Sequence, residues 1–201
     1  MERPTLDFWF FIGSTYSYLS VLRADEAAAR AGVALRWMPF NVRAIMHEQN
    51  NVPFAGKPVK LRYMWRDLER RARRHGLPFK GVPAYPVDPQ GLANRLAFVA
   101  ARQGWCADYT RSVYRAWFLD GQAPGEATAL AALLQGLGQD GAAVIEQAQA
   151  DTTRSAYDAQ TERAKALGIF GSPSFVTEDS EVFWGDDRLE DALDWAAGRA
   201  R

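Results

Sequence analysis

The hydrophobic pattern begins with a strand that is apolar on both faces. Residues Leu6 to Ile12 (LDFWFFI) are almost continuously hydrophobic, which is typical of a strand buried on both sides. Gly13 interrupts this run, and Tyr16 to Ala31 then places apolar side chains at helical spacing before Gly32. Val33 to Phe40 alternates as a second strand does. These segments together predict a βαβ unit with a right-handed crossover.

The middle of the chain carries a helical pattern between two loops. Asn41 to Pro58 is rich in Asn, Pro and Gly, so we expect a loop there, followed by a helix from Val59 to His75. Phe79 to Pro89 contains three prolines and also predicts a loop. Further helices are predicted over Gly91–Arg102, Ala107–Phe118, Glu126–Gly136, Gly141–Ala150 and Ser155–Leu167.

A strand pattern returns only near the end of the chain. Pro173 to Thr177 and Glu181 to Trp184 predict a hairpin. A last helix is predicted from Asp187 to Gly198, capped by Asp186 or Asp187. The order of elements indicates one α/β domain interrupted by an all-helical insertion: residues 1–58 form its first part (βαβ), 59–168 the insertion, and 169–201 its second part (ββα).

Composition and charge indicate an ordinary globular protein. The 201 residues are 48% hydrophobic and 24% charged, and the 24 Lys and Arg residues balance the 24 Asp and Glu residues. Nothing in this balance favours a nucleic-acid partner. One stretch is locally basic, and beside Asp67 and Glu69 we interpret it as a solvated, partly paired helix face rather than a phosphate-binding patch. Its arginines are Arg66, Arg70, Arg71, Arg73 and Arg74.

The counts of cysteine and histidine exclude several kinds of chemistry. Cys106 is the single cysteine, which excludes an intrachain disulfide and any Cys-x-x-Cys motif, and we predict that it is a packing residue. His47 and His75 have no ligand partner at metal spacing, so we expect no metal site. No signal peptide is evident and no apolar run approaches the ~18 to 20 residues that span a bilayer, so a cytoplasmic location without membrane contact is expected.

A first candidate for chemistry is Gly13-Ser14, directly after the buried strand. A hydroxyl at the start of a helix lies among free backbone N–H groups at the positive end of the helix dipole, where an anion such as a thiolate is stabilised. A simple N-cap serine is the alternative interpretation.

Two further candidates precede and follow the predicted hairpin. Ser172-Pro173 stands at the start of a strand, where a cis bond would direct the backbone of Ser172 toward the helix start, although most bonds before proline are trans. Asp186, Asp187 and Arg188 follow at a strand-to-helix turn, where carboxylates, N–H groups and a guanidinium are suited to bind a zwitterionic amino acid. A doubly acidic helix cap explains the same residues.

Taken in this order, these features resemble a known family. The chain is similar over essentially its whole length to the 2-hydroxychromene-2-carboxylate isomerases and the related kappa-class glutathione transferases, in the DsbA-like branch of the thioredoxin superfamily. The resemblance implies a thioredoxin-like fold interrupted by the helical insertion. It rests on residues 7–10 (DFWF), 14–19 (STYSYL), 51–53 (NVP), 60–64 (KLRYM), 170–173 (FGSP) and 184–189 (WGDDRL).

The resemblance also implies a site for glutathione. Ser14 matches the serine whose hydroxyl bonds the glutathione sulfur, and Ser172, before a cis-Pro173, matches the residue whose backbone binds the cysteinyl part. Residues that match the rest of the glutathione or substrate site are Asn51, Pro53, Lys60, Asp187 and Arg188, with Asp186 close by. Thr15 stands where relatives have proline and Phe11 where an acidic residue is common, which leaves the substrate open.

The mechanism that we expect uses glutathione as a regenerated cofactor: its thiolate adds to a small aromatic or conjugated substrate, a bond rotates, and elimination yields the isomer. Lys60 is either a partner for a substrate carboxylate or a surface lysine, Phe54 and Tyr85 are candidates to border the substrate, and His47 is not expected to be catalytic. A glutathione transferase or reductase and a non-catalytic thioredoxin-like module are the alternatives, and a homodimer is implied by the resemblance alone.

Overall fold

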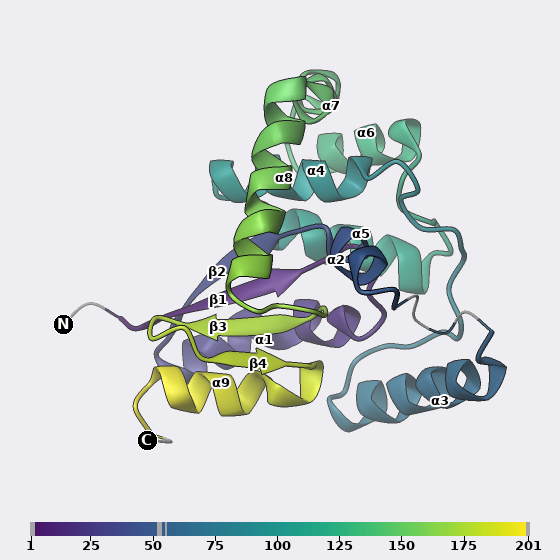
Figure 1. Ribbon diagram of the computed structural model, residues 1–201. Helices are drawn as coiled ribbons and strands as arrows, with labels where there is room; N and C mark the ends of the chain where they lie inside the picture. Colours follow the sequence, from purple (N-terminus) through teal and green to yellow (C-terminus); the bar gives the residue numbers. More distant parts are fainter. Residues whose placement is uncertain (1–2, 52–53, 55, 200–201) are drawn as a thin grey trace.

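The computed structural model describes residues 3–51, 54 and 56–199, and within these the centre of the fold is a four-stranded sheet with the order β2-β1-β3-β4 (Figure 1). β2 runs parallel to β1, whereas β3 is antiparallel to β1 and β4 is antiparallel to β3. The predicted βαβ order and the terminal hairpin are thus confirmed. The strands are β1 (Thr5–Phe10), β2 (Ala34–Pro39), β3 (Ser174–Thr177) and β4 (Val182–Trp184).

Helices cover both faces of this sheet and continue beyond one end of it (Figure 1). α1 and α9 pack on one face, and α2 and α8 pack on the other. The helices are α1 (Ser17–Ala31), α2 (Val42–Glu48), α3 (Pro58–Arg74), α4 (Leu92–Gln103), α5 (Cys106–Leu119), α6 (Ala127–Gly136), α7 (Gly141–Gln149), α8 (Asp151–Ala166), the 3₁₀ turn η1 (Asp186–Arg188) and α9 (Leu189–Ala196).

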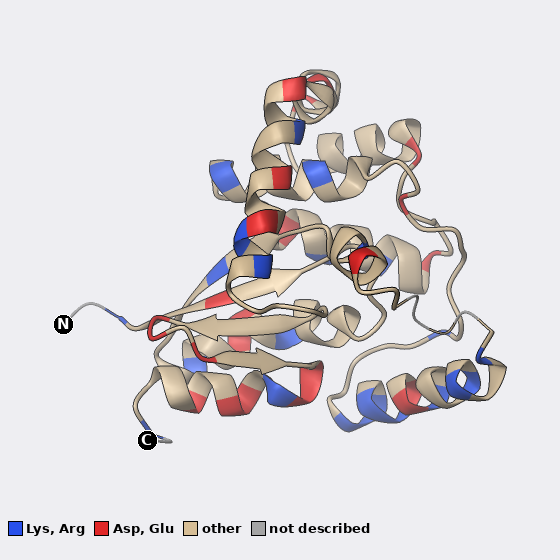
Figure 2. Cartoon of the chain, in the orientation of Figure 1, with Lys and Arg blue, Asp and Glu red and all other residues tan. Residues whose placement is uncertain are grey.

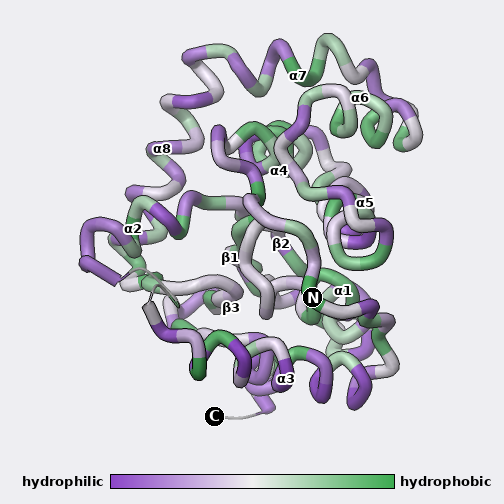
Figure 3. The backbone as a smooth tube through the Cα atoms, turned by 90° about the vertical axis from the view of Figure 1, so that its right-hand side faces the viewer, coloured by the Kyte–Doolittle hydropathy of each residue, from purple (hydrophilic) through white to green (hydrophobic). Residues whose placement is uncertain are grey.

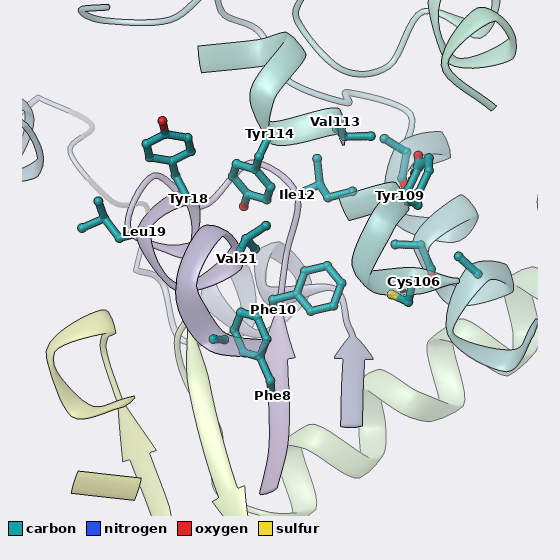
Figure 4. Close-up of a cluster of buried hydrophobic side chains, with 14 of the residues drawn as sticks. Phe8, Phe10, Ile12, Tyr18, Leu19, Val21, Cys106, Tyr109, Val113 and Tyr114 are labelled. Carbon is teal, nitrogen blue, oxygen red and sulfur yellow. Dashed lines mark hydrogen bonds between the residues drawn. The ribbon is translucent and has the colours of Figure 1, made fainter. Parts of the chain in front are cut away.

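The two faces of β1 belong to two different buried clusters. Phe8 and Phe10 pack with α1, α5 and α9, and Figure 4 shows them beneath Val21, Tyr109 and other side chains of that cluster. Trp9, on the opposite face, packs with side chains of α2 and α8. Because successive side chains of a strand point to opposite faces, a strand between two cores is apolar at nearly every position. The continuous hydrophobic run at the start of the sequence is explained in this way.

The loop expected over Asn41–Pro58 was wrong in its first part, because α2 forms there. The Asn41 side chain caps this helix by accepting a hydrogen bond from the Ala44 N–H at 3.3 Å. Val42 and Ile45, three positions apart, are buried on one side of the helix. The first asparagine of this stretch, Asn41, therefore marks the start of a helix and not only a loop.

The inserted helices share a core with the sheet domain. Tyr18 of α1 stacks on Phe118 of α5 with ring centroids 4.0 Å apart, inside one cluster that also includes residues of α4, α6 and α7. The division of the chain into a first part (1–58), an insertion (59–168) and a second part (169–201) stays a prediction. α3 lies apart from the other inserted helices and is mostly hydrophilic (Figure 3). In the part of the chain that the structure describes, no helix combines the length and apolar character needed to cross a bilayer.

Candidate functional site

The structure brings two of the predicted site residues into direct contact. The Ser14 hydroxyl donates a hydrogen bond to the backbone carbonyl of Ser172, with 2.7 Å between the two oxygens, although 158 positions separate the residues. Both residues are half-buried. The bond between Ser172 and Pro173 is cis, as the family resemblance implies. We call these two serines the Ser14–Ser172 pair.

The side chain of Ser172 fixes the start of β3 against the end of β1 and the start of α1. Its hydroxyl oxygen accepts a hydrogen bond from the Phe11 N–H at 3.0 Å and lies 2.9 Å from the Ser17 hydroxyl. Three segments distant in sequence therefore meet at one serine. The backbone of Ser172 is held in place by these contacts, independently of the bond from Ser14.

The turn that carries Ser14 is held by two side chains that sequence reasoning missed. Asn94 of α4 forms a pair of hydrogen bonds with the backbone of Ile12, accepting from its N–H at 2.8 Å and donating to its carbonyl at 2.9 Å. The Tyr114 hydroxyl of α5 donates to the carbonyls of Phe11 and Ser14 at 2.8 and 3.0 Å. Burial raises the pKa of Tyr114 well above its ordinary value, which keeps this donor protonated. The inserted helices thus position the turn.

Glycine is required within this turn. Gly13 has a φ of +127°, and a β-carbon there would lie 2.7 Å from the ring of Phe11. The Ser14 N–H then bonds the Phe11 carbonyl at 3.0 Å. The Gly13-Ser14 pattern thus reflects a backbone geometry that only glycine tolerates well.

Ser14 is not the N-cap of α1, which corrects the simple cap interpretation. Tyr16 occupies the N-cap position and no side chain caps the helix. Bonds from the Tyr18 and Leu19 N–H groups to the carbonyls of Thr15 and Tyr16, each 3.2 Å, tighten the first turn. Ser14 therefore precedes the helix start, and its hydroxyl points to Ser172 rather than to an N–H group of α1.

Asp186 is the centre of a buried ion-pair cluster. It is only 2% exposed, and its two carboxylate oxygens accept hydrogen bonds from Ser20, Arg23 and Arg71. The shortest of these, from Arg71, is 2.6 Å. Because both oxygens are taken by the protein itself, Asp186 is suited to position its neighbours rather than to contact a solute. Arg71 was predicted to lie on a solvated face, and this was wrong.

The other arginines of that basic run agree with the prediction. Arg66 and Arg73 pair with Glu69, and Arg70 pairs with Asp67, all within α3. Figure 2 shows basic and acidic residues along the same helix. Surface pairs of this kind contribute little to stability, typically below ~1 kcal/mol each. α3 is attached instead to the start of α1, by a 2.8 Å bond from the Tyr16 hydroxyl to Asp67, and to η1, by the Arg71–Asp186 pair.

Asp187 and Arg188 are exposed beside the buried Asp186. The Arg188 guanidinium donates to Asp187 at 2.9 Å and to Asp191 at 2.7 Å. Partial burial of Asp187 acts to raise its pKa, but the hydrogen bond and charge of Arg188 outweigh it and leave the pKa below its ordinary value. Both side chains are about half exposed and thus remain accessible to a ligand.

Asn51 and Lys60 are the remaining predicted site residues that the structure describes. Asn51 is exposed and its N–H bonds the Met46 carbonyl at 2.8 Å, and Lys60 lies on the exposed first turn of α3. Pro53 lies outside the described residues. Phe54 is half-buried, and Tyr85 is 52% exposed with its ring against Trp65 and Trp117. No hydrogen bond or ion pair between described residues joins Asn51 or Lys60 to the Ser14–Ser172 pair.

Exposed aromatic rings lie next to Ser172. Phe170 and Trp184 are 43% and 53% exposed, and their ring centroids are 4.8 Å apart. Gly171 lies between Phe170 and Ser172, and a β-carbon there would come within 2.2 Å of the Trp184 indole nitrogen. Glycine at this position is therefore what lets the indole ring lie against the backbone. The surface beside the Ser14–Ser172 pair is apolar as a result.

The sole cysteine of the chain is unsuited to act as a nucleophile. Cys106 is 4% exposed, its sulfur lies 3.4 Å from the Ala97 carbonyl, and burial raises the pKa of its thiol to about 12. The prediction that it is a packing residue is confirmed by its place in the main buried cluster. Among the described residues, no group of three or more His, Cys, Asp and Glu side chains is arranged to hold a metal ion.

We expect Cys106 to resist thiol reagents in the folded protein at neutral pH and to react once urea unfolds the chain. Its raised pKa keeps the folded thiol protonated, whereas an unfolded thiol ionises near ~8.5. The retained proton also means that this group's contribution to stability is full below pH ~8.5 and is lost as the pH rises toward 12. Alkylation rates with and without urea check this, and fast labelling in native buffer would contradict it.

Comparison with known proteins defines the class. Residues 5–194 match the family model of the DSBA-like thioredoxin domain. The chain therefore belongs to the DsbA-like thioredoxin family, and the predicted thioredoxin-like α/β fold is confirmed.

Within that family, particular enzymes are similar to this chain. A 2-hydroxychromene-2-carboxylate isomerase of Pseudomonas putida is 28% identical over 197 residues, 96% of this chain and 94% of the relative. A solved structure of a 2-hydroxychromene-2-carboxylate isomerase superposes with a TM-score of 0.84 at 29% identity, covering 97% of this chain and 95% of the other. Glutathione S-transferase kappa 1 of Caenorhabditis elegans is 34% identical over 86 residues, 42% of this chain and 38% of that protein. Relatives of these kinds support an enzyme.

Proposed function

We propose that this chain is a glutathione-dependent isomerase of an aromatic or conjugated carboxylate such as 2-hydroxychromene-2-carboxylate. The observation that carries the proposal is the Ser14 hydroxyl, held before the start of α1 by the Ser172 carbonyl, in a chain whose own thiol is buried. A site built for sulfur chemistry without a reactive cysteine calls for sulfur from a ligand. The similarity to isomerases and to a kappa-class transferase supports the same conclusion.

Ser14 supplies the donor that a thiolate needs. Free glutathione is mostly protonated at neutral pH, because an ordinary thiol has a pKa near ~8.5. A hydroxyl donor at the positive end of the α1 dipole favours the ionised form and lowers that pKa. The role of Ser14 is therefore to hold the ligand's sulfur as an anion.

In this proposal the other parts of glutathione bind residues near Ser14. The Ser172 N–H has no acceptor among the described residues, which leaves it available to the cysteinyl carbonyl of glutathione. Asp187 and Arg188, exposed and oppositely charged, suit the ammonium and carboxylate of the γ-glutamyl end. Asp186 positions this pair from beneath through Arg23 and Arg71. Asn51, Pro53 and Lys60 stay proposed members of the glutathione or substrate site.

The reaction that we propose conserves atoms and electrons. The hemiketal ring of the chromene first opens: its ring C–O bond breaks, the hydroxyl proton passes to the phenol oxygen, and C2 becomes a ketone conjugated with the C=C bond. The thiolate sulfur then forms a bond to the C=C carbon that is farther from the ketone, and the π electrons move onto the ketone oxygen to give an enolate. The former double bond is now single and rotates. The enolate electrons then re-form the double bond and expel the thiolate, so glutathione is returned and nothing is oxidised. The apolar surface of Phe170 and Trp184 suits an aromatic substrate beside the sulfur.

A kappa-like glutathione transferase is the second candidate, favoured by the partial similarity to the Caenorhabditis elegans enzyme. It shares the first addition step but retains the sulfur–carbon bond in its product. Mass analysis separates the two, because an isomerase leaves the concentration of free glutathione unchanged after many turnovers. We also propose that the protein is a homodimer and is located in the cytoplasm.

Calorimetric titration with glutathione tests the proposal. We expect saturable binding with ultraviolet absorbance of a thiolate at neutral pH, and we expect S-methylglutathione, which retains the tripeptide but has no ionisable thiol, to bind without that signal. The absence of affinity for either compound would remove the proposed function. Binding without thiolate or turnover would favour the non-catalytic thioredoxin-like module.

A further inference from the structure

A cavity of about 350 Å³ is lined by residues of α2, α4 and α8 and by Phe11, directly after β1. Figure 1 shows where these helices lie relative to β1. The volume of the cavity is within the range of ~300 to 1,000 Å³ that small-molecule sites occupy. Arginines from all three regions line it, so we call it the arginine cavity. The side chains that the argument uses are Phe11, Arg43, Arg95, Arg154, Tyr157 and Asp158.

The three arginines have no carboxylate partner among the described residues. Arg43 donates to the carbonyls of Val87 and Asp88 at 2.7 and 3.0 Å, and Arg95 donates to the carbonyls of Gln90 and Ala148, each at 2.9 Å. Arg154 donates to the Gln149 carbonyl at 3.1 Å. Most other arginines of the described chain form ion pairs, as for example Arg71 and Arg111 do. A cavity lined by three unpaired guanidinium groups is therefore exceptional in this protein.

The two acidic residues beside the cavity balance only part of this charge. Asp88 is fully buried, and its carboxylate accepts hydrogen bonds from the N–H groups of Ala93 and Asn94 and from the Asn94 amide, at 2.8 to 3.0 Å. Asp158 is exposed. Burial, and to a lesser degree the charge of Arg154, lowers the pKa of Arg95. Three guanidinium groups against two carboxylates leave one positive charge, which suits a monoanion.

A buried hydroxyl without a partner lines the same cavity. Tyr157 is 4% exposed, and its hydroxyl has no hydrogen-bond partner among the described residues. Its ring is fixed edge-on against Phe98, with centroids 5.8 Å apart. A buried polar group without a partner costs roughly 1–3 kcal/mol, so native proteins rarely leave one unless a ligand or water completes it. The hydroxyl is a donor that an anion in the cavity can use.

The arginine cavity adjoins the turn that carries Ser14. The Phe11 ring forms part of its wall, while the Phe11 backbone bonds both serines of the Ser14–Ser172 pair. The Arg43 guanidinium lies over that ring at 4.8 Å, and a β-carbon on Gly13 would be 3.3 Å from it. Gly13, directly before Ser14 in the sequence, therefore lies close to the Arg43 guanidinium.

We propose that the arginine cavity binds the carboxylate of the substrate through Arg43, Arg95, Arg154 and the Tyr157 hydroxyl. The identity of the ligand rests on the proposed function, but carboxylate binding is measurable without glutathione or turnover. The cavity then sets specificity for substrates that carry a single carboxylate, a role earlier considered only for Lys60.

Titration with salicylate, an aromatic carboxylate that cannot isomerise, tests the proposal on the whole protein. We expect salicylate to bind at millimolar or lower concentration, salicylamide to bind at least about tenfold more weakly, and inorganic phosphate to compete poorly. Arg154→Met and Tyr157→Phe should each weaken salicylate binding about tenfold. Arg102→Met, on α4 but packed over Phe98 outside the cavity, is the matched control.

Tyr157→Phe is the variant in which weaker binding is least open to explanation by a loss of folding stability. Loss of an unpartnered hydroxyl should leave the free energy of unfolding unchanged or raise it, so weaker salicylate binding would report the ligand contact alone. With the chromene substrate, Arg154→Met should raise KM while kcat and glutathione affinity stay unchanged. The inference would be overturned if salicylate did not bind, if these substitutions left its affinity unchanged, or if the protein bound phosphate more tightly than salicylate. Carboxylate binding in a protein without glutathione affinity would instead overturn only the proposed function.

Discussion

Replacing Ser14 by alanine should lower kcat/KM for the isomerisation by about 100-fold, because the glutathione thiolate loses a hydrogen bond to a charged group worth roughly 1.5–3 kcal/mol. The substitution removes the hydroxyl that donates to Ser172 in the structure and, in our proposal, to the glutathione sulfur. Glutathione should still bind through its two ends, but the ultraviolet absorbance of its thiolate should disappear at neutral pH. Steady-state kinetics and that absorbance measure the effect.

Two further variants make this result interpretable. Ser155→Ala, on an exposed position of α8, should leave both activity and thiolate unchanged. Ser14→Cys should form a mixed disulfide when incubated with oxidised glutathione, because the new thiol lies where the ligand's sulfur is expected. Undiminished turnover in Ser14→Ala would refute the mechanism, whatever the fate of the cysteine variant.

Replacing Asp186 by alanine should destabilise the protein by about 3–5 kcal/mol, the cost of leaving buried charges without their partner. Arg23, about 10% exposed at its side chain, would retain only its pair with the exposed Glu190, and Arg71 would lose its carboxylate partner. Since natural domains are stable by only ~5–15 kcal/mol, this is a large fraction of the total. Urea unfolding followed by circular dichroism measures the change.

The control for this prediction is an ion pair on the surface. Asp194→Ala breaks the exposed contact with Arg199, and we expect it to cost less than ~1 kcal/mol. Asp186→Asn, which preserves shape and one acceptor, should be less damaging than Asp186→Ala, and its glutathione affinity should still fall because Asp187 and Arg188 lose their anchored neighbour. Equal stability of the Asp186 and Asp194 variants would show that the buried cluster is not the tie between α1, α3 and η1.

Sequence patterns predicted the sheet and most helices because those depend on local periodicity. The apolar run of residues 6–12 and the hydrophobic run that begins the terminal hairpin each gave the correct strand, since burial at nearly every position leaves a direct trace in the sequence. α2 was missed because Asn41 is as common in loops as at helix starts, and only its bond to Ala44 separates the two.

The candidate site was predictable only in part. Ser14 and Ser172 were found through the motifs that precede a helix and a strand, and the structure joins them. Asn94 and Tyr114, which hold the Ser14 turn, give no signal in the sequence, because their partners are backbone groups 82 and 100 positions or more away. The partners of Asp186 were hidden for the same reason: a carboxylate beside a helix start resembles a cap until Arg23 and Arg71 are seen to reach it.

The bond between the two serines also limits how tightly the sulfur is held. To donate to a thiolate, the Ser14 proton must swing away from the Ser172 oxygen, so ligation trades one acceptor for another instead of adding a new bond. The net gain from this donor in the ground state is then smaller than the roughly 1.5–3 kcal/mol of a hydrogen bond to a charged group, because the bond to Ser172 is lost in exchange. Weak retention of the sulfur suits a catalyst that must release it at every cycle, and affinity for the tripeptide then comes mainly from its two charged ends.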